Sequence, residues 1–362
     1  MKRKVTVAQY GCGRMSRYLM RYAIEKGCEL VAAFDMNPEI IGKDVGEIIG
    51  DGYKHVGVAV NNSDKADEML GKLKPDVCII ATRSTLAEIA DIMTICANHG
   101  INAVSICEEA LYPWNSSPAL TKELDELAKK GNCTLTGVGY CELFWGTMVT
   151  NLAGSSFDIK TIRGSSWYNV EDYGIALAEG HGAGLSIDEF NKTIGCYNDT
   201  PSDEIKKLVE SGAYVPSYMW NQNGWLCSKL GLTVVSQTQK CIPCTHDKDL
   251  HSETLGMTIK AGDATGMAAV VTTETAEGIT LITECVGKVY APDEFDKNEW
   301  TLEGEPDTTV IVNRPATVEL TCATLVNRIA HLIDAPAGYV TTDRFPYNEY
   351  YVRPINEYVK TK

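Results

Sequence analysis

Residues 5–16 read VTVAQYGCGRMS, a short β-favouring run followed by a turn of small residues. The turn matches the pattern G-x-G-x-x-G, with a small serine in the third glycine position. Gly11 permits a tight turn, and Gly13 lets the backbone come close to a pyrophosphate. Helical spacing over 14–26 predicts that the N–H groups of a helix N-terminus face the phosphates. The residues predicted to hold a dinucleotide here are Gly11, Cys12, Gly13, Arg14, Met15 and Ser16.

An acidic residue follows where such a site needs one. Asp35 ends the second apolar run, 24 positions after Gly11, where a carboxylate accepts hydrogen bonds from an adenosine ribose. Its charge favours NAD(H), whereas Arg14 and Lys43 leave NADP(H) open, so the predicted cofactor is NAD(H) or NADP(H). Further cofactor contacts are expected from residues that follow the second and fourth strand-like runs: Met36, Ala81, Thr82, Arg83 and Thr85.

The order of apolar runs and helical stretches predicts an α/β fold in two domains. Strand-like runs at 30–34, 56–60, 76–81, 101–106 and 133–136 alternate with helical spacing, which indicates a Rossmann-type doubly wound parallel sheet over 1–145. From 146 to 315 apolar and polar residues alternate, as in a largely antiparallel open sheet of an α+β substrate-binding and dimerisation domain. An amphipathic helix begins at 316, and the segment 316–362 is expected to pack back on the first domain.

Composition excludes several classes of function. The net charge of −15 argues against binding to nucleic acid or an anionic membrane, and no run is long enough to span a membrane. Thirteen scattered cysteines fit reduced thiols in a cytoplasmic protein. Cys241, Cys244, His246 and His251 lie within 11 residues, but no second C-x-x-C accompanies them, so no metal site is predicted.

Two adjacent acids mark the candidate catalytic position. The stretch AVSICEEALYPW (103–114) is an apolar strand that ends in Glu108 and Glu109. In a doubly wound sheet this strand end lies beside the nicotinamide, where an apolar setting raises a carboxyl pKa towards neutrality and suits acid–base work. The alternative is that the acids begin a helix and interact with its dipole, which applies more to Glu109 than to Glu108.

Aromatic residues concentrate after the first domain and predict an apolar substrate pocket. Three aromatic residues lie in each of GVGYCELFWG (137–146), SSWYNVEDYG (165–174) and YMWNQNGW (218–225), and a histidine lies between glycines in EGHGAG (179–184). Aromatic residues are as often core as pocket, so the set is a hypothesis. It comprises Tyr140, Phe144, Trp145, Tyr168, Tyr173 and His181, with Glu109 as a further substrate contact.

The GCGRMS turn, the CEEALYPW strand end and the GVGYCELFWG stretch, in this order and spacing, resemble the native NAD(P)-dependent amine dehydrogenases. That family is related to 2,4-diaminopentanoate dehydrogenase and more remotely to dihydrodipicolinate reductase. The resemblance implies NAD(P)H-dependent reductive amination of a small ketone or aldehyde with ammonia, reversible to amine oxidation. It implies Glu108 as the catalytic residue, Trp145 and the neighbouring aromatics as the pocket, and a homodimer.

Four alternatives remain beside this reading, and the first is that the chain is a 2,4-diaminopentanoate dehydrogenase. A sugar or polyol oxidoreductase is expected to carry a lysine after the strand-end glutamate, where this chain has Glu109. A dihydrodipicolinate-reductase-like imine or carbonyl reductase is expected to show paired histidines, and the chain contains no His-His pair. A non-catalytic dinucleotide sensor would leave Glu108 unexplained, although a fold by itself does not prove activity.

Overall fold

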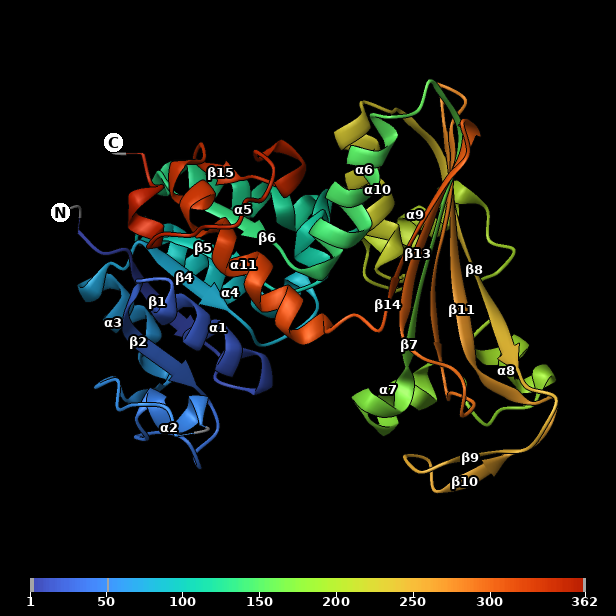
Figure 1. Ribbon diagram of the computed structural model, residues 1–362, viewed down its shortest axis with the longest axis horizontal. Helices are drawn as coiled ribbons and strands as arrows, with labels where there is room; N and C mark the ends of the chain where they lie inside the picture. Colours follow the sequence, from blue (N-terminus) through green and yellow to red (C-terminus); the bar gives the residue numbers. More distant parts are fainter. Residues whose placement is uncertain (1–2, 51, 361–362) are drawn as a thin grey trace. The chain divides into compact units, whose positions relative to one another are not determined.

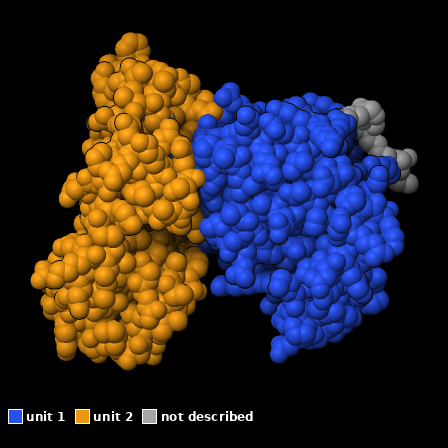
Figure 2. Space-filling view, turned by 180° about the vertical axis from the view of Figure 1, so that it is seen from behind, with its two compact units in different colours: residues 1–143, 316–362 blue, residues 144–315 orange. Residues whose placement is uncertain are grey.

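The computed structural model describes residues 3–50 and 52–360. The chain divides into two units, which Figure 2 shows in different colours. Unit 1 comprises residues 1–143 together with 316–362, and unit 2 comprises residues 144–315.

A seven-stranded parallel sheet forms the centre of unit 1 (Figure 1). Its spatial order is β15-β6-β5-β4-β1-β2-β3. The strands are β1 (Thr6–Tyr10), β2 (Glu29–Asp35), β3 (Val60–Asn62), β4 (Val77–Ile80), β5 (Asn102–Ser105), β6 (Thr134–Gly137) and β15 (Gly338–Tyr339). The predicted Rossmann-type sheet is confirmed.

The expected strand at 56–60 is wrong in position, since β3 begins only at Val60. Residues 56–59 lie in a loop because the backbone N–H groups of Val56 and Gly57 bind the Asp44 carboxylate at 2.9 and 2.8 Å. Val58 accepts a backbone hydrogen bond from Val45. This β-favouring stretch therefore pairs with the preceding loop, and only its last residue reaches the sheet.

Helices cover both faces of the sheet of unit 1. On one face α1 (Arg14–Glu25) lies beside α11 (Thr317–Asp334), and their buried apolar residues share one core (Figure 1). The opposite face is covered by α3 (Ala66–Leu73), α4 (Leu86–Asn98) and α5 (Pro118–Gly131). The short α2 (Val45–Ile49) packs on α1. Short turns of helix are η1 (Ser63–Lys65), η2 (Glu109–Leu111), η3 (Pro113–Asn115), η6 (Thr342–Arg344) and η7 (Ile355–Glu357).

Unit 2 is built on a six-stranded mixed sheet of order β14-β13-β7-β12-β11-β8. Only the pair β7–β12 is parallel, so the predicted largely antiparallel sheet is confirmed. The strands are β7 (Asp158–Asn169), β8 (Val234–Thr245), β11 (Ala264–Thr275), β12 (Thr280–Lys288), β13 (Lys297–Glu305) and β14 (Thr308–Asn313). A separate hairpin pairs β9 (Leu250–Ser252) with β10 (Met257–Ile259).

One face of this sheet is covered by α10 (Met219–Leu230), whose buried Asn223 is bound by two strands. Its side-chain amide donates to Thr273 Oγ1 at 3.0 Å, and its carbonyl oxygen accepts from Thr283 Oγ1 at 2.8 Å. The other face, the open face, carries residues such as Ile242 and Ile311 that are each 50% exposed. The remaining helices of unit 2 are α6 (Met148–Ala153), η5 (Val170–Tyr173), α7 (Ile175–Gly180), α8 (Ile187–Thr193) and α9 (Ser202–Glu210).

Candidate functional site

The turn between β1 and α1 has a backbone shape that requires glycine. Gly11 has φ +87°, and a Cβ there would lie 2.4 Å from the carbonyl oxygen of Ala81. This close approach brings the end of β1 against the loop after β4. At Gly13, by contrast, a Cβ would meet nothing within 4 Å, and the residue is exposed. The open backbone at the α1 N-terminus therefore fits a phosphate-bearing ligand.

Ser16, which replaces the third glycine of the pattern, closes this turn. Its side chain is fully buried, and its hydroxyl donates to the carbonyl oxygen of Gly11 at 2.5 Å. The side-chain amide of Gln9 donates to the same carbonyl at 2.9 Å and to Ser16 Oγ at 3.3 Å. Sequence reasoning missed Gln9, although a buried glutamine in an apolar strand is a recognisable signal because it needs partners.

Asp35 lies at the end of β2, beside the same turn. Its Oδ2 accepts a hydrogen bond from the backbone N–H of Cys12 at 2.6 Å, and its Oδ1 accepts one from Asn37 at 2.8 Å. A carboxylate has about four lone-pair directions, so lone pairs remain for the two hydroxyls of a ribose. The neighbouring Met36 is 78% exposed. The residues around Asp35 therefore fit the adenosine half of a dinucleotide.

The other residues predicted to hold the cofactor lie at this edge of unit 1. Arg14 and Met15 open α1, and Ala81, Thr82 and Arg83 follow β4, which is paired with β1. Thr85 is the N-cap residue of α4. The structure thus brings together every residue predicted to bind the cofactor at the carboxyl ends of β1, β2 and β4, where doubly wound sheets bind their ligands.

Glu108 follows β5 at the same edge and is only partly exposed. Burial raises the pKa of Glu108 above its ordinary value, although its own backbone N–H and the Ser84 hydroxyl favour the charged form. A raised pKa brings a carboxyl group closer to the pH of the reaction, which is the direction that general acid–base catalysis requires. Ser84 was missed as a partner because it lies in the loop after β4, far from Glu108 in sequence.

Glu109, the second acid, binds groups of the protein with both carboxylate oxygens. Its Oε2 accepts from the backbone N–H of Leu86, the first residue of α4, at 2.6 Å. Its Oε1 accepts from the hydroxyls of Ser116 and Ser117, each at 2.6 Å. Glu109 therefore caps α4 from a distant loop and orders the segment after β5. Its substrate contact stays a prediction.

Three of the residues predicted to line the pocket contact one another in unit 2: Tyr168 and His181 are hydrogen-bonded, and Tyr173 packs on Tyr168. Tyr168 Oη lies 2.7 Å from Nε2 of His181, whose Nδ1 lies 2.8 Å from the carbonyl oxygen of Leu177. A carbonyl only accepts, so Nδ1 carries the proton and Tyr168 donates to Nε2. Burial lowers the pKa of His181 and raises the pKa of Tyr168 well above its ordinary value, so both groups are neutral at pH 7. Tyr173, which is 55% exposed, packs edge-on against Tyr168.

The remaining predicted pocket residues lie on or next to a π-helix, η4 (Cys141–Thr147). Tyr140 immediately precedes it, and Phe144 and Trp145 lie within it. Tyr140 and Trp145 are buried, whereas Phe144 is partly exposed. Tyr140 belongs to unit 1, and Phe144 and Trp145 belong to unit 2.

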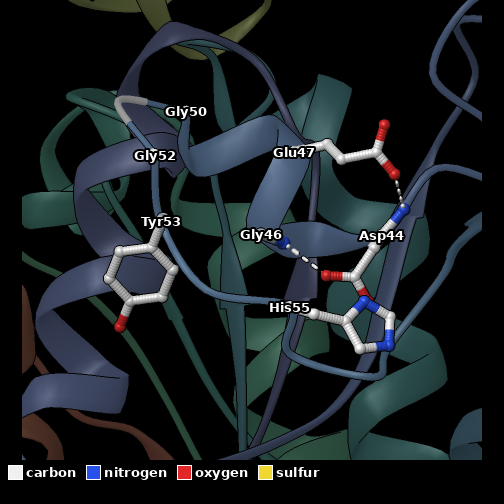
Figure 3. Close-up of a pocket in the computed structure, with 7 residues that line it drawn as sticks. All are labelled: Asp44, Gly46, Glu47, Gly50, Gly52, Tyr53 and His55. Atoms are coloured by element: carbon white, nitrogen blue, oxygen red, sulfur yellow. Dashed lines mark hydrogen bonds and ion pairs between the residues drawn. The ribbon is translucent and has the colours of Figure 1, made fainter.

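A pocket of about 230 Å³ lies in the connection between β2 and β3 (Figure 3). Its lining includes the Asp44 carboxylate, which accepts backbone N–H bonds from Gly46, Val56 and Gly57 and lies 3.1 Å from Nδ1 of His55. Although burial alone would raise it, these donors hold the pKa of Asp44 below its ordinary value. The carboxylate uses its hydrogen bonds to stabilise the loop in which it lies, so we assign this pocket no ligand.

Within residues 3–50 and 52–360, no three His, Cys, Asp or Glu side chains are grouped closely enough to hold a metal ion. Cys241 and Cys244 are three residues apart on β8, so their side chains point to opposite faces of the sheet. In the same part of the chain, none of the helices has the length and apolar character that crossing a membrane requires.

Comparison with known proteins finds an amine dehydrogenase that matches nearly the whole chain. An amine dehydrogenase structure from Mycobacterium smegmatis shares 37% identity, with 97% of this chain and 98% of that chain covered and a TM-score of 0.81. The 2,4-diaminopentanoate dehydrogenase of Acetoanaerobium sticklandii is 26% identical over 201 residues, which are 53% of this chain and 54% of the relative. The match thus spans about half the length of that curated relative.

A more distant structure shares the fold alone. The myo-inositol 2-dehydrogenase of Lactobacillus plantarum is 13% identical, with 94% of this chain and 93% of that chain covered and a TM-score of 0.56. No protein-family model matches the sequence.

Proposed function

Because the chain belongs to the amine dehydrogenases, a family of NAD(P)-dependent oxidoreductases, we propose that it catalyses reductive amination of a small ketone or aldehyde with ammonia. The reaction is reversible to oxidative deamination of the amine. The single observation that carries the proposal is Glu108, a partly exposed carboxyl group with a raised pKa at the end of β5, beside the edge that fits a dinucleotide.

Glu108 has three roles in this proposal. Ammonia attacks a carbonyl only in its neutral form, so the carboxylate first accepts a proton from ammonium. The carboxyl group then donates that proton to the hydroxyl of the carbinolamine, which leaves as water. The carboxylate formed by this step stabilises the positive charge of the iminium ion. A raised pKa suits all three roles, because it makes the carboxylate a stronger base towards ammonium and keeps the protonated form accessible at a higher pH than for an ordinary glutamate.

The cofactor-binding residues support the same chemistry. The α1 N-terminus with Gly11, Gly13 and Arg14 would hold the pyrophosphate, and Asp35 would hold the adenosine ribose. When bound, the nicotinamide supplies the hydride that reduces the iminium carbon. We propose a preference for NAD(H) over NADP(H), since the Asp35 carboxylate repels a 2′-phosphate.

The substrate contacts are proposed from the aromatic residues. Apolar rings exclude water and orient the carbonyl carbon, which fits a small ketone or aldehyde. The neutral Tyr168–His181 pair adds a polar group without a net charge. The residues proposed to contact the substrate are Tyr140, Phe144, Trp145, Tyr168, Tyr173 and His181, with Glu109 at the catalytic end.

A second candidate function is oxidation of a diamino acid, in line with the name of the 2,4-diaminopentanoate dehydrogenase that the chain matches over 201 residues. Such a substrate carries a carboxylate, which needs a cation or several donors for binding. Oxidation of 2,4-diaminopentanoate can be compared directly with reduction of simple carbonyl compounds. Activity with it and none with simple carbonyl compounds would favour the second function.

We also propose a cytoplasmic homodimer. All thirteen cysteines are free thiols, in keeping with a reducing compartment. The open face of the sheet in unit 2 suits two-fold pairing because it combines half-exposed Ile242 and Ile311 with charges of both signs, such as Arg163 and Glu299. Ile311→Asp should halve the mass in sedimentation equilibrium, and an unchanged mass would contradict this interface.

The test of the function is NADH and NADPH oxidation with a panel of ketones and aldehydes, with and without ammonium. The reverse reaction with 2,4-diaminopentanoate is measured in parallel. Glu108→Ala is compared with Glu126→Ala, an exposed glutamate on α5 that serves as a matched control. We expect ammonium-dependent oxidation that Glu108→Ala abolishes and Glu126→Ala retains. Oxidation without ammonium would instead identify a carbonyl reductase, and absence of any activity would favour a dinucleotide sensor.

A further inference from the structure

The π-helix η4 carries two of the aromatic residues proposed for the substrate pocket. π-helices are rare, and they occur mostly as single turns within α-helices, frequently at functional sites. The winding of η4 determines the direction of each side chain that follows Glu142, including Phe144 and Trp145. Whatever holds this winding therefore also orients those side chains.

An ion pair in the core of unit 1 holds the first turn of η4. The side chains of Glu142 and Arg328 are 0% and 1% exposed. Arg328, on α11, donates from Nε to Glu142 Oε1 at 2.8 Å, and its Nη2 donates to the same oxygen. Two donors on one oxygen fix the position of the Glu142 side chain more tightly than a single bond does.

Arg328 is itself fixed by further contacts. Its Nη1 donates to the carbonyl oxygen of Pro346 and lies 3.0 Å from Nδ1 of His331, and its guanidinium lies over the Phe345 ring. A guanidinium only donates, so His331 Nδ1 is the acceptor and its proton is on Nε2, which faces Tyr351 Oη at 3.4 Å. Burial and the charge of Arg328 lower the pKa of His331, which keeps it in this neutral form.

The last part of η4 is held separately, within unit 2. The side-chain amide of Asn298 donates to the carbonyl oxygen of Phe144 at 3.2 Å, and Asn298 Oδ1 accepts from the Trp300 indole at 2.9 Å. A Cβ at Gly146 would lie 2.7 Å from the ring of Trp225. Side chains outside the helix thus fix η4 on both sides of Leu143.

The energetics of buried ion pairs argue for a role beyond stability. Burying two charges costs roughly as much free energy as their attraction returns, so replacing both by apolar residues is often neutral or stabilising. Stability alone therefore does not explain the Glu142–Arg328 pair. Without its hydrogen bonds, we expect the more common α-helical winding to compete with the π-helix and to rotate the side chains after Glu142.

We propose that Glu142 and Arg328 are positioning residues, which hold the π-helical winding of η4 and thereby the orientation of Trp145. The proposal rests on the function proposed above, in which Trp145 contacts the substrate. It does not require either residue to touch the substrate or the cofactor.

The test compares wild type with the variant Glu142→Met/Arg328→Met after labelling with 5-fluorotryptophan. The chain has six tryptophans, and Trp145→Phe identifies the fluorine NMR line of Trp145. We expect this line to shift or split in the double variant while the lines of Trp220 and Trp300 and the melting temperature stay close to those of wild type. We expect kcat to fall at least tenfold, more than KM changes, because misplaced reactants lose rate.

A single substitution separates positioning from stability. Glu142→Gln keeps an acceptor for Arg328 but leaves its charge buried without a counterion, so the melting temperature should fall while the Trp145 line stays in place. If the double variant does not fold, Arg328→Gln supplies the comparison, because the shorter side chain loses the paired donors. Two results would overturn the proposal. One is a Trp145 line that stays at its wild-type position in the double variant or in Arg328→Gln. The other is a Trp145 line that shifts in Glu142→Gln together with the fall in melting temperature. The fluorine spectra can be recorded whether or not the protein is active. An inactive wild type would contradict the proposed function without affecting the test of the positioning role.

Discussion

Ser84→Ala tests whether the ionisation of Glu108 governs the rate. The Ser84 hydroxyl binds the Glu108 carboxyl group and favours its charged form. Removing the hydroxyl should therefore raise the pKa of Glu108 further and move the acidic limb of the pH–rate profile to higher pH. The plateau at high pH should stay near that of wild type, since the carboxylate that accepts the proton is still present.

The size of the shift follows from the hydrogen bond that is lost. A hydrogen bond to a charged group contributes about 1.5–3 kcal/mol, and partly exposed Glu108 regains some of this from water. We therefore take the low end of the range, about 1.5 kcal/mol. Since one pKa unit corresponds to about 1.36 kcal/mol, the acidic limb of the profile should move by about one pH unit.

The assay measures kcat/KM for the carbonyl substrate from pH 6 to 10 at saturating ammonium. Wild type and variant share the same buffers, so the titration of ammonium itself cancels in the comparison. Ser117→Ala is the matched control, because it removes an equivalent hydroxyl that binds Glu109 instead. A limb that does not move in Ser84→Ala, or that moves equally in Ser117→Ala, would refute the assignment of Glu108.

Three further predictions concern stability and cofactor choice. Because the pKa of Glu108 is raised in the folded state, its contribution to stability is present below about pH 4.5 and is lost as pH rises through the folded pKa. The melting temperature of Glu108→Gln relative to wild type should therefore increase from pH 4.5 upwards, and a constant difference would contradict the raised pKa. Asp35→Asn removes the charge that repels a 2′-phosphate, so the ratio of kcat/KM for NADPH to that for NADH should rise about tenfold; an unchanged ratio would assign the preference to other residues. Gly164→Ala places a Cβ 2.4 Å from the Trp300 ring and should destabilise by about 1–3 kcal/mol, seen as a lower urea midpoint, whereas an unchanged midpoint would mean that the ring moves freely.

The fold of unit 1 could be predicted from the sequence because its signals are local. The VTVAQYGCGRMS stretch, the alternating apolar runs and the position of Asp35 each depend on residues close together in the chain. β15 was not predicted, since two residues, Gly338 and Tyr339, form no recognisable run. Their strand exists because β6 offers them a partner, which is a property of the folded sheet.

The site could be predicted in outline, but its hydrogen bonds could not. The position of Glu108 after β5 follows from strand order, and its raised pKa follows from burial at that edge. Ser84, by contrast, reaches Glu108 from the loop after β4, and Glu109 binds the backbone of Leu86, which is 23 residues away in the chain. Such partners depend on which loops meet in space, and the spacing of residues along the chain does not contain this information.

The position of α11 in unit 1 has a consequence for biosynthesis. Residues 144–315 interrupt unit 1, and α11 supplies Leu325 and Ile329 to the core that contains Leu19 of α1. The ribosome therefore synthesises the whole of unit 2 before α11. Until α11 emerges, the apolar side of α1 that it covers in the folded protein remains exposed. We expect nascent chains that end at residue 315 to be cleaved rapidly by protease within residues 1–143 and to resist cleavage within unit 2. Equal resistance of both parts would show that the sheet of unit 1 closes without its last helix.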